Sequence, residues 1–115
     1  MFRHDLKVYL APGATDLRKS IDGLSILVEN RMELNPFSGY LFAFCNRKRT
    51  TVKILYWDRN GFSLWMKRLE SQTFQWPDVD TRTVSISTRE LNWLLDGLAL
   101  DQKRAHRSLQ FSCVS

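Results

Sequence analysis

The sequence is poor in the residues that most metal sites and many active sites need. Its 115 residues include two cysteines, two histidines and five glycines. Cys45 and Cys113 lie far apart and show no zinc-ligand spacing, so neither a zinc site nor a disulfide framework is indicated. His4 and His106 fall in the two terminal segments, where a rigid general base is not expected. Because no two glycines stand close enough to form a phosphate-binding loop, we predict neither a metal nor a cofactor.

The chain also lacks a long uninterrupted apolar run. Residues 1–7 alternate charged and apolar side chains and resemble neither a signal peptide nor a membrane span. We therefore expect a cytoplasmic protein without membrane association. The length suits one domain with a modest core, which we place at residues 1–100. Residues 101–115 lose apolar periodicity and are expected to form a flexible basic tail.

Acidic residues are outnumbered by basic ones. The chain has 17 Lys and Arg against 12 Asp and Glu, which gives a formal net charge of +5. A basic excess attracts polyanions, and DNA or RNA is the commonest such partner. A mildly basic protein that binds no nucleic acid is the alternative.

Hydrophobic patterning predicts a sheet and two helices. The expected strands are residues 7–10, 40–45, 52–57, 62–69, 73–76 and 84–86. Residues 40–45 are apolar throughout, so this strand should be buried on both faces or nearly so. Residues 62–69 also fit a helical stripe, but the Asn60-Gly61 turn signal before them favours a strand.

The first helix is predicted to begin at Thr15 or Asp16 and to end before Pro36. The second has a capping box from Ser87 to Glu90 and should run from residue 88 to about residue 98. Together these elements predict a small single α+β domain, an antiparallel β-meander with two helices packed on one side.

Carboxylates offer a weak case for catalysis. Two-metal nucleases need several acids that converge on divalent ions, and Asp16, Asp22, Asp58 and Glu70 are the candidates. Asp58 is more simply explained as the first residue of a loop whose side chain bonds local amides. We predict that the protein is not an enzyme, and a nuclease that uses Asp58 and Glu70 is the weakest alternative.

Three basic features are candidate DNA contacts. A predicted hairpin loop carries cations without an acid, and two further cations fall in the expected first turn of the first helix, where an anion would relieve their conflict with the helix dipole. The third feature follows Trp65, a ring that more simply covers the edge of the core. In chain order the cations are Arg18, Lys19, Arg47, Lys48, Arg49, Lys53, Lys67 and Arg68. A solvated, aggregation-resistant surface explains the loop equally well.

The sequence also permits a protein-binding role without DNA contact. Aromatic residues on the sheet would then supply the interface, with Trp57, Trp65 and Trp76 as candidate anchors.

Four segments carry a resemblance to a known family: "VYLAPGATDLRKSIDGLSILV", "NPFSGYLFAFCNRKRTTVKILYWDRNGFSLWMKRLE", "FQWP" and "VSISTRELNWLLDGL". From about Val8 to Leu98 the chain resembles the accessory proteins, usually called TnpB, of the bacterial insertion-sequence family numbered sixty-six. The RNA-guided nuclease that shares this name is a different protein. The loop "NRKRTT" departs from the commoner family form, which often has a Gly-Asp turn there.

The resemblance implies a mobile-element protein that is encoded beside a larger transposase and is needed for transposition. It transfers no catalytic role to any residue here. Our leading hypothesis is therefore a non-catalytic accessory protein that binds DNA and assists a partner transposase.

Overall fold

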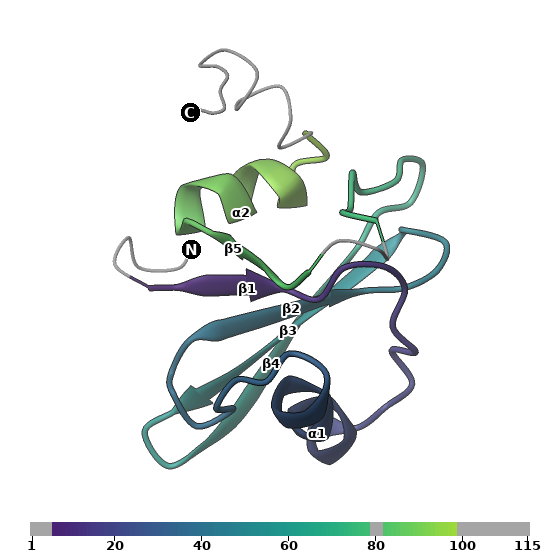
Figure 1. The fold of residues 1–115 in the computed structure, drawn as a ribbon. Coiled ribbons are helices and arrows are strands. Elements are labelled where there is room, and N and C mark those ends of the chain that lie inside the picture. The colour runs from purple at the N-terminus through teal and green to yellow at the C-terminus, as the bar shows by residue number, and fades with distance from the viewer. Residues whose placement is uncertain (1–5, 79–81, 99–115) are drawn as a thin grey trace.

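A computed structural model describes residues 6–78 and 82–98, and the predicted tail at 101–115 lies outside these residues. One five-stranded sheet forms the middle of the molecule, with α1 (Ile21–Asn30) and α2 (Thr88–Leu95) on opposite sides of it (Figure 1). The α+β class predicted from the sequence is confirmed. Neither helix in the described parts of the chain has the length and apolar character that crossing a membrane requires.

The sheet has the strand order β4-β3-β2-β1-β5. Its strands are β1 (Val8–Leu10), β2 (Leu41–Cys45), β3 (Thr51–Asp58), β4 (Gly61–Arg68) and β5 (Val84–Ile86). Strands β2, β3 and β4 are joined by short turns and pair antiparallel, as the meander prediction requires. β1, however, pairs parallel with β2 and antiparallel with β5. The meander is therefore only part of the sheet, because a parallel pair needs a crossover, which here contains α1.

The prediction that both helices pack on one side is wrong. β2 is fully buried along its length. Phe42 and Phe44 point into a core beneath α1 with Leu24 and Val28, which we call the α1-side core. The alternate β2 residues point into the opposite core, where α2 contributes Leu91, Leu94 and Leu95, and we call this the α2-side core. A strand that is apolar on both faces must be covered on both faces, so one helix lies on each.

Helix α1 begins later than predicted. Its N-cap is Ser20, whose hydroxyl accepts a hydrogen bond from Gly23 N. The expected N-cap, Thr15, is still held to the sheet, because its amide donates to Cys45 O at 2.8 Å. Arg18 and Lys19 consequently lie in the connection before the helix and not in its first turn.

Helix α2 begins where the sequence predicts, with both hydrogen bonds of the Ser87–Glu90 capping box present. It ends at Leu95, earlier than predicted, because Gly97 adopts a positive φ of 89°. The amides of Gly97 and Leu98 then donate back to Leu94 O and Trp93 O, a Schellman ending.

Of two further predicted strands, one is confirmed and the other is wrong. Residues 62–69 were ambiguous in sequence, and the strand choice is confirmed by β4. Residues 73–76 are not a strand, but Phe74 and Trp76 from this segment are buried in the α2-side core. The segment is tied to the fold by two distant contacts, Phe74 N to Arg49 O at 2.7 Å and Trp76 Nε1 to Ala11 O at 2.9 Å. Its alternating pattern reflects burial against the core and not pairing in the sheet.

Candidate nucleic-acid interface

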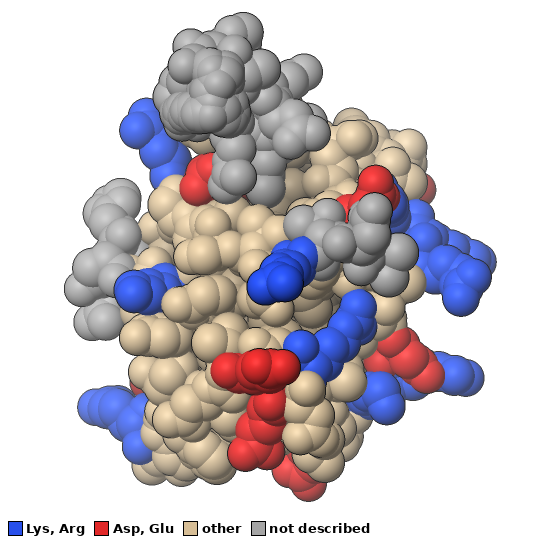
Figure 2. All heavy atoms as spheres, in the orientation of Figure 1, with Lys and Arg blue, Asp and Glu red and all other residues tan. Residues whose placement is uncertain are grey.

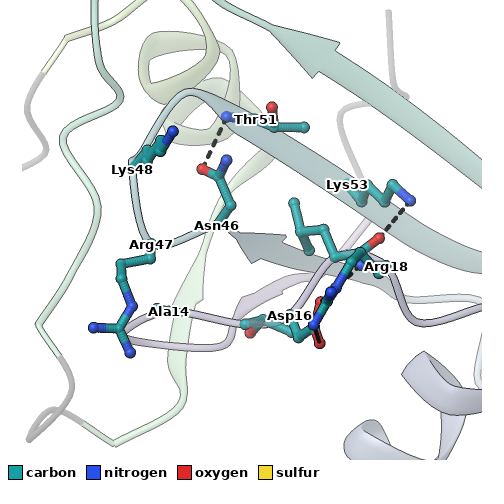
Figure 3. Close-up of a pocket in the computed structure, with 10 residues that line it drawn as sticks. Ala14, Asp16, Arg18, Asn46, Arg47, Lys48, Thr51 and Lys53 are labelled. Carbon is teal, nitrogen blue, oxygen red and sulfur yellow. Dashed lines mark hydrogen bonds and ion pairs between the residues drawn. The ribbon is translucent and has the colours of Figure 1, made fainter.

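Two of the three predicted basic features meet at one open pocket of about 760 Å³. Its walls are the β2–β3 loop, the first part of β3, and the connection between β1 and α1. Figure 3 shows Arg47 and Lys48 on the loop at one side, with Asp16, Arg18 and Lys53 at the other. The residues that line this basic pocket are Ala14, Thr15, Asp16, Leu17, Arg18, Asn46, Arg47, Lys48, Thr51 and Lys53.

The loop wall is shaped by the side chain of Asn46. Its Oδ1 accepts hydrogen bonds from the amides of Thr50 and Thr51, at 2.9 and 3.1 Å. Its Nδ2 donates to Thr50 Oγ1 at 3.1 Å, so one side chain fixes the far end of the loop. Arg47 and Lys48 are exposed, and neither has a hydrogen-bond or ion-pair partner within residues 6–78 and 82–98. These two cations remain available to an external anion.

The opposite wall holds an ion pair. The Arg18 guanidinium donates to both carboxylate oxygens of Asp16, each at 3.0 Å, and the Arg18 amide also donates to Oδ1. These hydrogen bonds lower the pKa of Asp16 to about 2 and raise the pKa of Arg18. Asp16 therefore stays ionised at neutral pH, and it offsets the charge of Arg18.

Lys53 extends from the sheet toward the same connection. It lies on β3, on the face that carries Leu55 and the α1-side core. Its ammonium donates to Leu17 O at 2.7 Å and is partly buried (Figure 3). An ammonium has three N–H donors, so this contact positions Lys53 and leaves two donors unused.

The pocket lining is strongly basic overall. Among the described residues of the lining, the four cations are Arg18, Arg47, Lys48 and Lys53 and the one acid is Asp16, so their formal charge is +3. Figure 2 shows Lys and Arg atoms scattered over the drawn face among acidic atoms, with a group projecting on the side where Figure 1 places the β2–β3 loop. The excess positive charge of the lining attracts anions to the pocket.

Thr15 is the one residue of the lining with an unsatisfied buried group. The residue is 6% exposed, and Oγ1 has no hydrogen-bond partner among the residues that the structure describes. From the sequence, Thr15 was predicted only as a possible helix cap. Its place in the pocket depends on the fold, which brings it beside Cys45 and the basic loop.

The other four predicted cations lie elsewhere or are engaged. Arg49 forms an ion pair with Asp78 at 3.2 Å, which turns it away from the pocket. Lys67 Nζ donates to Leu95 O at 2.8 Å and so supplies a cation to the C-terminal end of α2. Arg68 pairs with Glu70 at 3.0 Å. Lys19 is exposed but does not line the pocket.

The three tryptophans proposed as partner anchors have different environments. Trp57 packs edge-on against Phe37 and Phe62, with ring centroids 5.1 Å away in both cases, and we call these three rings the aromatic cluster. Phe37 is 55% exposed, so the cluster reaches the surface. Trp65 is half-buried against the α2-side core, and Trp76 is 4% exposed within it. Trp76 is therefore a core residue with little surface to offer a partner.

The structure does not bring the candidate nuclease carboxylates together. Asp58 pairs with Gly61 at the start of β4, whereas Glu70 follows the end of this eight-residue strand. A strand of that length spans roughly 25 Å. Asp22 lies in the first turn of α1, and no three His, Cys, Asp or Glu side chains gather as a metal site within the described residues.

Burial raises the pKa of the Cys45 thiol to about 12, which leaves it protonated at neutral pH.

Comparison with known proteins gives the chain its family. The family model described as "IS66 Orf2 like protein" matches residues 6–105. The uncharacterized protein y4hO of Sinorhizobium fredii is 34% identical over 94 residues, which is 82% of each chain. A second protein of that organism, y4jC, is 31% identical over 93 residues, covering 81% of this chain and 80% of its own. No solved structure gives a significant match. The chain therefore belongs to the IS66 Orf2 like family, whose members have an accessory role in IS66 transposition and so imply a transposase partner.

Proposed function

We propose that the protein is a non-catalytic accessory factor that binds DNA through the basic pocket and assists the transposase of its element. The observation that supports this most is the +3 lining, built from two segments that are far apart in sequence. Arg47 and Lys48 provide exposed, unengaged charge, and Lys53 and Arg18 extend it into the hollow. A protein with this role works in the cytoplasm, together with the DNA that it binds.

Phosphate contacts are the chemistry that such a surface performs best. Cations that neutralise phosphates release condensed counterions, so binding weakens as salt concentration rises. No aromatic ring is among the described residues that line the pocket, so these residues do not stack on a base. We therefore expect binding that depends on charge and geometry more than on base sequence.

The test is a fluorescence-anisotropy titration on transposon-end DNA and random DNA at several salt concentrations. The double variant Arg47→Ala/Lys48→Ala should lose at least about tenfold in affinity at low salt, and its salt slope should fall by about 2. The matched control is Arg59→Ala/Arg82→Ala, which removes the same charge from exposed positions outside the pocket. DNA binding without salt dependence, or equal losses in the two double variants, would contradict the proposal.

The aromatic cluster supports a second candidate function, contact with the transposase. Phe37 presents an exposed ring beside Trp57 and Phe62, and none of the three lines the basic pocket. Exposed aromatic residues are typical anchors of protein interfaces. A further variant separates the two functions: Trp57→Ala should reduce co-purification with the transposase after nuclease treatment, while Arg47→Ala/Lys48→Ala should not.

A further inference from the structure

The basic pocket has features that general attraction to DNA does not require. A convex basic patch is sufficient to hold the outside of a duplex, but this charge surrounds a hollow of about 760 Å³. Hollows of this size hold whole ligand groups in other proteins. Among its lining residues, the Thr15 hydroxyl and the Lys53 ammonium have N–H or O–H donors that no described residue uses.

We propose that the pocket is a discrete phosphate site, in which Thr15 Oγ1 and Lys53 Nζ donate to the oxygens of one phosphate group of a DNA strand. The inference rests on the proposed DNA-binding function and adds a defined ligand to it. Arg47 and Lys48 then form the outer wall that draws the strand in, while Thr15 and Lys53 hold the phosphate at the bottom.

The Thr15 hydroxyl is the observation that carries this proposal. Its oxygen is almost completely buried, Thr15 is one of the residues that line the pocket, and no described residue accepts or donates a hydrogen bond to the hydroxyl. A buried polar group without a partner destabilises the folded state, so such groups need an explanation. The Thr15 backbone is fixed by its amide, which donates to Cys45 O at 2.8 Å. In the proposed complex the Thr15 side chain rotates about its Cα–Cβ bond to turn the buried hydroxyl toward the phosphate. A ligand that accepts its proton would remove the destabilisation.

Lys53 is prepared for the same ligand. Its hydrogen bond to Leu17 O at 2.7 Å fixes the ammonium beside the connection that carries Thr15. Two of its three N–H donors remain for an anion, and its partial burial strengthens the attraction by excluding water. Asp16 repels an anion, but both of its oxygens accept from the Arg18 guanidinium, which limits that repulsion.

The donor set favours phosphate over other anions. A hydroxyl, an ammonium and flanking guanidinium groups suit a tetrahedral group with several acceptor oxygens. The phosphate has two sources in DNA, a diester inside the strand or a monoester at a 5′ end. Short single strands with a 5′-phosphate or a 5′-hydroxyl distinguish them: a preference for the phosphorylated strand indicates the monoester, and equal affinity indicates the diester.

The central experiment compares Thr15→Val with Thr15→Ser in the full chain. Valine keeps the shape and removes the hydroxyl, so DNA affinity should fall about tenfold, whereas serine should retain most of it. The salt slope should not change in either variant, because no charge is removed. Thr73→Val, at an exposed position outside the pocket, is the matched control. The free Thr15→Val protein should be as stable as the wild type or more so, since it loses an unsatisfied group.

A second probe separates this inference from the proposed function. Inorganic phosphate titrated into the wild-type protein should shift the amide NMR resonances of residues 14–18 and 53, and Thr15→Val should weaken this response. If Thr15→Val binds DNA and phosphate as the wild type does while Arg47→Ala/Lys48→Ala still weakens DNA binding, the phosphate site is refuted and DNA binding stands. If phosphate binds in the pocket but the wild type shows no salt-dependent DNA binding, the DNA function fails and the phosphate site is then limited to a ligand other than a DNA strand.

Discussion

At the scale of single residues, what a cation already contacts decides whether it can bind an anion. Lys53 and Lys67 both donate to backbone carbonyls, yet one lies in the pocket and the other closes the end of α2. Arg47 is exposed and unengaged in the described structure, whereas Arg49, two residues along, is paired with Asp78. The sequence could identify the eight cations, but the partners of Arg49, Lys53 and Lys67 come from residues distant in the chain. The number of basic residues in the sequence therefore overestimates the number of cations that are available to an anion.

Asp16 provides a residue-scale prediction with a gain of binding. Asp16→Asn removes the one acid of the pocket and frees Arg18, so DNA affinity should rise several-fold at low salt. The salt slope should steepen by about one, which anisotropy titrations at several salt concentrations measure. If the variant binds more weakly, the ion pair positions Arg18 for the ligand instead of neutralising it.

The pH dependence of the wild type follows from the same residue. The pKa of Asp16 is lowered from 3.8 to about 2, so its contribution to stability is present above pH 3.8 and is lost as pH falls toward 2. From pH 5 to 8 Asp16 stays charged, and its titration should leave DNA affinity unchanged.

At the scale of elements, local signals predicted what local interactions determine. The capping box of α2 is complete within four adjacent residues, so the start of this helix was predictable. The start of α1 was not predictable, because Thr15 and Asp16 are both plausible caps from the local sequence. The hydrogen bond from Thr15 N to Cys45 O, which keeps Thr15 out of the helix, joins residues that are distant in the chain. The parallel pairing of β1 with β2 is equally non-local. The pocket depends on both local and non-local interactions. Its β2–β3 loop was predictable from the local sequence, but its opposite wall lies in the crossover between β1 and β2.

The α2 capping box gives an element-scale prediction. Ser87→Ala removes the acceptor for Glu90 N, a bond of 3.1 Å, and should lower the free energy of unfolding by about 1 kcal/mol. Chemical denaturation measures this, and Ser87→Asp, which keeps an acceptor, should lose much less. Equal stability of the alanine variant and the wild type would mean that α2 is held by its packing in the α2-side core alone.

At the scale of the whole molecule, β2 connects the two cores and the site. Its side chains alternate between the α1-side core and the α2-side core. Cys45, its last residue, accepts the bond from Thr15 that holds one wall of the pocket, and Asn46 begins the loop that forms the other. The most buried strand of the sheet thus fixes the backbone of both walls of the pocket.

This sharing predicts that the two cores unfold together. Leu24→Ala in the α1-side core and Leu94→Ala in the α2-side core each remove a fully buried side chain and should cost about 2–5 kcal/mol. Because both cores pack on β2, Leu24→Ala should reduce amide-exchange protection in α2 as much as in α1. Leu94→Ala should likewise reduce protection in α1 as much as in α2. Hydrogen exchange followed by NMR measures both variants. If protection is lost only in the helix on the mutated side, each face unfolds independently, and a change at α2 would then leave the basic pocket intact.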